Sequence, residues 1–249
     1  MCTVVVSLDP SARMPLLLVG IRDEMLDRPW LPPGRHWPDL PLIGGQDKQA
    51  GGTWLAVHPA IPRVASVLNG LGQAAPEPFR KSRGDLPLLA AAGGRPAIDR
   101  LDPGAYDPFH LVVADTWSVE MLSWDGVRVT RTSLSPGTHM ITNAGADGAE
   151  PKTAYFAEKF AATRPDPAPA PAQDREHDPG LDEDDPARAW GAWWALAEGD
   201  GLPEADPRAI RVRRLLPEGR LWGTSSVSLV ALSGNGTRYD FTAVSGTGQ

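Results

Sequence analysis

Residues 3–6 (TVVV) and 14–21 (MPLLLVGI) are the two apolar stretches that open the chain. The first is rich in β-branched side chains, which favour strands. Between them, Asp9-Pro10-Ser11 has the composition of a turn. We therefore expect a buried antiparallel hairpin at the start of the chain, and this hairpin decides the fold.

Strand-like segments recur further along the chain. We expect them at residues 54–57 with 63–68, at 111–114, 119–122 and 127–130, and at 226–232 with 237–244. Asp125-Gly126 is a hairpin turn signal inside the middle group. Strands are thus expected near both ends of the sequence.

Helices are expected only between these strands, at residues 85–92, 152–163 and 186–198. In the second of these segments, Phe156 and Phe160 recur at helical spacing. The pattern predicts an α+β protein in which two mostly antiparallel sheets pack face to face with helices outside. Both ends of the chain should contribute strands to this sandwich.

Length and composition agree with one large folded domain over residues 1–249. The chain has 249 residues, of which 41 % are hydrophobic, so it can bury a sizeable core. Residues 164–189 break the pattern, with six prolines and eight acidic residues against three arginines, and we interpret them as a flexible excursion. The net charge of −7 argues against a nucleic-acid or anionic-membrane surface.

Several common sites are excluded by the sequence. The single cysteine cannot form an internal disulfide, and the longest apolar stretch is too short to span a membrane. The five histidines are scattered, which makes a structural zinc site improbable. Glycine-rich phosphate cradles and the Gly-x-Ser-x-Gly motif do not occur. Without a basic region at the start, no signal peptide is expected, and a cytoplasmic setting is the default expectation.

The position of Cys2 is the strongest chemical signal. A small second residue permits removal of Met1, which would leave Cys2 with a free α-amine. That amine has a reference pKa of about 7.7–8.0, so it could accept the thiol proton near neutral pH. The alternative interpretation is that Cys2 only fills the start of the first strand.

Charged residues follow the second strand directly, as Arg22-Asp23-Glu24. In a hairpin, the end of the second strand lies beside the start of the first. Arg22 and Asp23 are therefore expected within reach of Cys2, where Arg22 could stabilise a thiolate and Asp23 could hold an α-ammonium group.

The sequence resembles the NRDE family, also called the transport and Golgi organisation protein 2 family. The resemblance rests on Cys2, 22–24 (RDE), 28–29 (RP), 43–47 (IGGQD), 51–57 (GGTWLAV), 68–69 (LN), 81–86 (KSRGDL), 106–115 (YDPFHLVVAD), 136–143 (PGTHMITN) and 222–225 (WGTS). Two positions depart from the family pattern: Ile21 stands in place of Asn, and Ser225 in place of Arg.

The family is similar to N-terminal nucleophile hydrolases, and the resemblance implies their four-layer αββα sandwich. It also implies catalytic roles for Cys2, Arg22, Asp23, Asn69 and Asn143, with Asn69 donating to the oxyanion of a tetrahedral intermediate. Each asparagine could instead be a turn residue. No metal or resident cofactor is implied.

Two functions are compatible with this resemblance. The first is hydrolysis of a linear amide C–N bond through an acyl-Cys2 intermediate, with a small-molecule substrate. The second is a non-catalytic carrier on the same fold, for which haem or a lipid is the implied ligand. A weaker third interpretation is a scaffold whose excursion at 164–189 binds a partner.

Overall fold

The predicted hairpin opens the structure, in which β1 (Thr3–Leu8) pairs antiparallel with β2 (Leu16–Met25). The structure is a computed structural model, and it describes residues 2–168 and 185–244. The register aligns Thr3 with Ile21 and Leu8 with Leu16. The end of β2 therefore lies beside the start of β1, as the sequence predicts.

The first sheet is built around this hairpin and joins segments from both ends of the described chain. Its strand order is β11-β10-β1-β2-β13-β12, and β14 also pairs with the long strand β13. All of these pairs are antiparallel. The added strands are β10 (Gly137–Thr142), β11 (Gly145–Ala146), β12 (Arg213–Leu215), β13 (Leu221–Ser233) and β14 (Gly236–Ala243).

The second sheet is an antiparallel meander in which neighbouring strands follow one another along the chain. It consists of β3 (Trp30–Gly34), β4 (Ile43–Asp47), β5 (Leu55–His58), β6 (Arg63–Asn69), β7 (Phe109–Asp115), β8 (Val119–Trp124) and β9 (Val129–Leu134).

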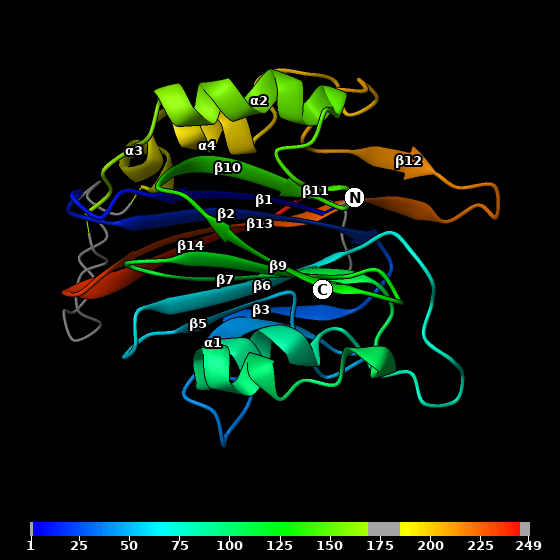
Figure 1. The fold of residues 1–249 in the computed structure, drawn as a ribbon. Helices are drawn as coiled ribbons and strands as arrows, with labels where there is room; N and C mark the ends of the chain where they lie inside the picture. The colour runs from blue at the N-terminus through cyan, green and yellow to red at the C-terminus, as the bar shows by residue number, and fades with distance from the viewer. Residues whose placement is uncertain (1, 169–184, 245–249) are drawn as a thin grey trace.

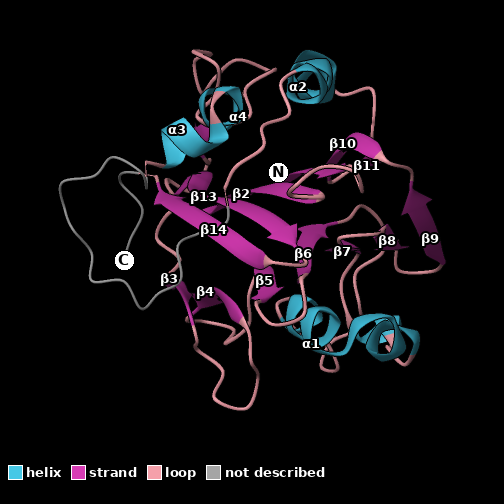
Figure 2. Cartoon of the chain, turned by 90° about the vertical axis from the view of Figure 1, so that its left-hand side faces the viewer, coloured by secondary structure: helices cyan, strands magenta, loops and turns pink. Residues whose placement is uncertain are grey.

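Helices cover the outer faces of both sheets (Figure 1). Turning the molecule by 90° shows the two helical layers at opposite sides of the stacked sheets (Figure 2). Helices α2 (Pro151–Ala162), α3 (Pro186–Trp190) and α4 (Ala192–Ala197) lie over the first sheet, and α1 (Asp85–Asp99) lies against the second, followed by a 3-10 turn at Pro103–Ala105. The order of layers is therefore αββα, and the α+β sandwich is confirmed.

Three apolar clusters fill the spaces between the four layers. Successive strand residues point to opposite faces, so both faces of β1 are buried in different clusters. Val4 and Val6 belong to the cluster between the sheets, whereas Val5 packs in the cluster below α2, α3 and α4 with Phe160 and Trp193. This double burial explains why the first strand is a continuous apolar run.

Two helices differ from the prediction, and glycine explains both. The predicted helix at 85–92 continues to Asp99, but it is kinked at Gly94, which has a φ of 58°. The predicted helix at 186–198 is divided into α3 and α4 by Gly191, which has a φ of 51°. A positive φ interrupts the regular α-helix, and glycine adopts it without a steric penalty.

Strands β3, β4, β10 and β11 are not predicted by the sequence pattern. Strand β3 contains Pro32-Pro33 and is tolerated because it lies at a sheet edge. Strand β4 contains Gly45, where a Cβ atom would lie 2.2 Å from the Trp54 ring. Close packing requires glycine there. Because glycine has no side chain, it contributes no hydrophobic pattern from which the strand could be predicted.

Most of the excursion at 164–189 lies outside the described residues, which exclude 169–184. Its two described ends make hydrogen bonds within the folded structure. Arg164 donates to the Ser7 hydroxyl at 3.0 Å and to the Met14 carbonyl at 2.8 Å. Asp185 caps α3 by accepting a hydrogen bond from the Ala187 amide at 2.9 Å.

Candidate active site

Cys2 lies directly before β1, at the end of the first sheet where charged residues of β2 gather. Extending the β1–β2 register by one residue from Thr3 and Ile21 places Cys2 opposite Arg22. The Cys2 Sγ atom also lies 3.5 Å from the Asp23 carbonyl oxygen. The hairpin therefore brings the thiol to the residues that the sequence predicted.

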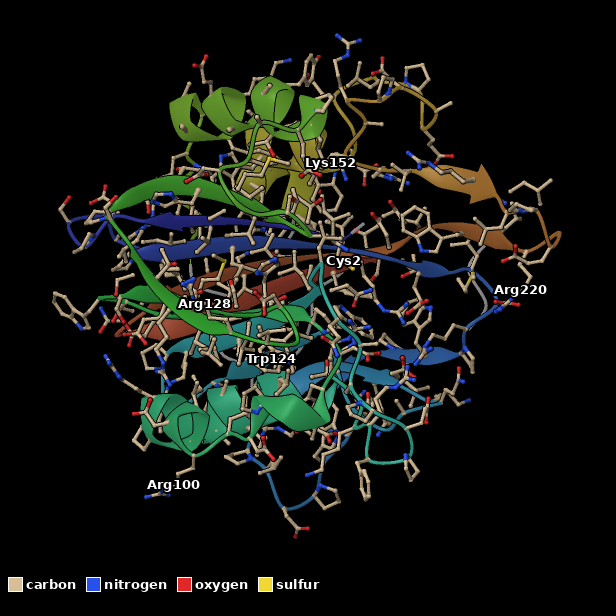
Figure 3. The ribbon with its side chains drawn as sticks, turned by 45° about the vertical axis from the view of Figure 1, so that its right-hand side comes forward. Cys2, Arg100, Trp124, Arg128, Lys152 and Arg220 are labelled. Atoms are coloured by element: carbon tan, nitrogen blue, oxygen red, sulfur yellow. The ribbon has the colours of Figure 1, made fainter. Side chains whose placement is uncertain are left out.

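A cavity of about 440 Å³ opens at this point between the two sheets. Cys2, Arg22 and Asp23 line it from the first sheet, and Asn69, the last residue of β6, lines it from the second. Four of the five predicted site residues thus surround one cavity. Figure 3 shows Cys2 near the middle of the molecule, with Lys152 above it at the start of α2.

Asn143, the fifth predicted residue, follows β10 and is not among the residues that line this cavity. The β1–β10 register aligns Val4 with Ile141, so its continuation leads from Asn143 towards Cys2. The Asn143 carbonyl accepts a hydrogen bond from His110 Nε2 at 3.1 Å. Its side-chain Oδ1 atom is buried and has no hydrogen-bond partner among the described residues.

Asp23 is a buried carboxylate, only 6 % exposed. Its Oδ1 atom accepts a hydrogen bond from the Thr224 hydroxyl at 2.7 Å. Burial raises the pKa of Asp23, while the charge of Lys152 and the Thr224 hydrogen bond act in the opposite direction. An ionised Asp23 therefore depends on nearby positive charge.

Arg22 is also buried, and its guanidinium is held on several sides. Nη1 donates to the Ser225 hydroxyl at 2.9 Å, and Nη2 lies 3.6 Å from Asp47 and 3.8 Å from Glu24. The guanidinium carbon is 4.6 Å from the centre of the Trp54 ring, a cation–π contact. Ser225, which replaces the arginine of the family pattern, is thus a direct partner of Arg22.

The thiol of Cys2 is not acidified by these surroundings. Burial raises its pKa, and the charge of Asp23 raises it further, whereas Arg22 lowers it by a smaller contribution. Any proton acceptor for this thiol must therefore lie close to it. Arg22 alone does not keep Cys2 in the thiolate form.

Lys152 has no role predicted from the sequence, although it is buried next to the site. Its exposed fraction is 7 %, and Nζ donates to the Thr3 hydroxyl at 3.2 Å. Burial lowers the pKa of Lys152, while the charges of Asp23 and Cys2 favour its protonated form. A lysine on the otherwise apolar side of a helix was the signal that could have identified it.

Asp47 and Arg28 form a second charged pair that received no role from the sequence. Arg28 Nε donates to Asp47 Oδ2 at 2.6 Å, and Arg28 also lies 3.7 Å from Glu24. Burial would raise the pKa of Asp47, but the hydrogen bond and the charge of Arg28 hold it below its usual value. This pair neutralises one wall of the cavity.

The described residues contain no cluster of histidine, cysteine and acidic side chains that could hold a metal ion. The four histidines among the described residues are also not among the cavity-lining residues. His36 contacts the Pro32 carbonyl, His58 the Ile61 amide, His110 the Ser123 hydroxyl, and His139 the Asp147 carboxylate.

Fold and site together define a class: an αββα sandwich in which a cysteine next to the first strand faces a charged cavity between the sheets. The family model for Transport and Golgi organisation 2 matches residues 1–177 of this chain, and the chain belongs to that family. This confirms the resemblance that the sequence suggested. The curated proteins include no match to the chain.

The matched range contains Cys2, Arg22, Asp23, Asn69 and Asn143, whereas β13 and β14 lie beyond it. Thr224 and Ser225, which hold Asp23 and Arg22, therefore come from outside the matched range. Within the described residues, the helices are too short or too polar to cross a membrane.

Proposed function

We propose that the protein is an N-terminal cysteine hydrolase that cleaves a linear amide C–N bond of a small molecule. The observation that supports this proposal is the meeting of Cys2, Arg22, Asp23 and Asn69 around one cavity. The proposal requires removal of Met1, which lies outside the described residues.

In the proposed reaction, the α-amine of Cys2 accepts the thiol proton while sulfur attacks the amide carbon. An amine with a pKa of about 7.7–8.0 suits this step near neutral pH, and the raised pKa of the thiol makes an adjacent base necessary. The C–N bond then breaks as the leaving nitrogen takes the proton back. Water next attacks the thioester, gives a proton to the α-amine, and releases the acid with the free thiol.

The neighbouring residues have distinct proposed roles. Asp23 would hold the α-ammonium group, and this positive charge would favour the ionised carboxylate at a site where burial raises its pKa. The Asn69 side-chain amide would donate to the oxyanion, and the family resemblance implies a further catalytic role for Asn143. Arg22 is a positioning residue, because its guanidinium already binds Ser225 and faces Asp47 and Glu24.

The alternative function is a non-catalytic carrier of haem or a lipid. The described residues fit haem poorly, because none of the histidines among them lines the cavity. Of the residue types that usually bind haem iron, which are His, Cys, Met and Tyr, only Cys2 is among the described cavity-lining residues. No step is therefore assigned to haem.

The test measures amine release from a panel of N-acyl arylamides, together with the intact mass of the protein. The parent should release arylamine and form a transient acyl adduct at Cys2, whereas Cys2→Ala should do neither. Asn69→Ala should lower kcat by about 100- to 1,000-fold, the usual effect of losing one oxyanion donor. Amine release that persists in Cys2→Ala would contradict the proposal. Stoichiometric ligand binding without turnover or adduct would favour the carrier.

A further inference from the structure

Arg83 is a half-buried cation in the wall of the Cys2 cavity. Its Nη1 atom donates to the Pro108 carbonyl at 2.9 Å. No described acid lies within ion-pair distance of its guanidinium. Burial lowers the pKa of Arg83, which expresses the cost of holding this charge away from water.

The other arginines that line this cavity have acidic partners. Arg22 faces Asp47 and Glu24, Arg28 binds Asp47, and Arg80 pairs with Glu77 and with Asp107 at 3.3 Å. Asp107 is further occupied by the Ala75 amide at 3.0 Å. Arg83 and Lys81 are therefore the cavity-lining cations without a direct ion pair among the described residues, and of the two only Arg83 is half-buried, whereas Lys81 is exposed.

The backbone holds Arg83 firmly on the second sheet. The Thr53 amide donates to the Gly84 carbonyl at 2.9 Å, and a Cβ atom at Gly52 would lie 2.5 Å from the Gly84 backbone. The Gly84 amide also donates to the Ser82 hydroxyl at 3.2 Å. Two glycines thus allow the 82–84 segment to pack directly on the strand connection that leads into β5.

We propose that Arg83 binds a carboxylate of the substrate, so that the protein acts on acid-bearing amides. A guanidinium with one donor used on a carbonyl still has planar N–H groups for a bidentate contact with a carboxylate. Such a contact would give Arg83 the direct acidic partner that it lacks among the described residues. The proposal rests on the proposed function for the reactive group, Cys2, and adds the substrate class.

The test uses thiol-alkylating reagents that differ only in charge. N-bromoacetyl derivatives of glycine, β-alanine and 4-aminobutyrate carry a carboxylate at three distances from the reactive carbon, and their carboxamides are neutral controls. Reaction at Cys2 is followed by intact mass. The rate ratio of each acid to its amide cancels any change in thiol pKa, because both reagents meet the same thiol.

At the best chain length, the acid should react faster than the amide in the parent. Arg83→Gln should reduce this ratio by roughly 10- to 100-fold, the range for a charge-assisted contact. Arg83→Lys should restore it in part, since lysine keeps the charge but not the planar fork. Lys81 also lines the cavity, but its charge is exposed to solvent. Lys81→Gln should therefore reduce the ratio of acid to amide rates much less than Arg83→Gln does.

A second measurement does not depend on a reactive thiol. The N-acetyl forms of the same three acids should raise the melting temperature of the parent more than their amides do, and this difference should vanish in Arg83→Gln. An acid preference that is missing in the parent, or that survives in Arg83→Gln, would overturn the carboxylate site. A protein whose Cys2 reacts with neither reagent, but whose stabilisation by acids depends on Arg83, would keep the site and refute the proposed hydrolase.

Discussion

The contact between Ser225 and Arg22 gives a sharp prediction, because the next residue of β13 is a matched control. Ser225 is 1 % exposed and accepts a hydrogen bond from Arg22 Nη1 at 2.9 Å. Ser226 is equally buried, but its hydroxyl has no hydrogen-bond partner among the described residues. The two serine-to-alanine changes remove the same atom from the same strand.

Ser225→Ala leaves a buried guanidinium N–H without its acceptor, and Ala cannot replace it. A hydrogen bond to a charged group contributes about 1.5–3 kcal/mol, and leaving a buried donor unpaired costs a similar amount. Because Asp47 and Glu24 remain close to Arg22, we expect a loss of about 1–3 kcal/mol in the free energy of unfolding. Ser226→Ala should be neutral within about 0.5 kcal/mol or slightly stabilising, since it removes a buried hydroxyl that is not bonded.

Urea unfolding followed by tryptophan fluorescence measures both differences. The melting temperature should fall by about 2–4 °C for each kcal/mol lost in a chain of this length. Equal free energies of unfolding for the two variants would refute the argument that Ser225 is the partner of Arg22. Ser225→Ala should change the alkylation rate of Cys2 little, because a hydroxyl carries no charge.

Three further changes test the electrostatics and the core. Asp23→Asn should lower the pKa of the Cys2 thiol and speed its alkylation by iodoacetamide while abolishing turnover, because the Asp23 charge raises that pKa; slower alkylation would contradict this sign. Lys152→Met should raise the pKa of both Cys2 and Asp23 and shift the pH profile of alkylation to higher pH, since it removes a positive charge that acts on both groups. An unchanged profile would mean that the Lys152 charge does not act on Cys2. Trp193→Ala should cost about 3–5 kcal/mol in urea unfolding, because the fully buried ring leaves a cavity and its Nε1 donor to Phe160 is lost; a cost below about 1 kcal/mol would mean that the helical layer is loosely packed.

The sequence was most informative where apolar residues form continuous runs. The runs at 3–6 and 14–21, with turn residues between them, predicted the hairpin, and the hairpin in turn predicted that Arg22 and Asp23 lie beside Cys2. This inference used a local rule, since paired strands of known direction determine which ends meet.

Contacts between distant segments could not be predicted in this way. Thr224, Ser225 and Lys152 reach the site through β13 and α2, which are more than 100 residues from Arg22 in the sequence. Thr224 and Ser225 are common polar types that also occur on surfaces, so no local pattern marks them as buried. The position of Lys152 on the apolar side of α2 indicates burial but not the site that it reaches. Strand β4 was missed for a related reason, because Gly45 is explained only by the Trp54 ring against it and Gly44 by the Leu55 carbonyl of the neighbouring strand.

The central claim is that Cys2 reacts through its own free α-amine, and intact-mass analysis after iodoacetamide treatment tests it most directly. The parent should lack Met1 and gain one adduct at Cys2. A form with leucine inserted between Met1 and Cys2 should retain methionine, because a bulky second residue prevents its removal, and its thiol should react more slowly near neutral pH. The account predicts this difference in rate. A parent that retains Met1, or equal rates in the two forms, would contradict it.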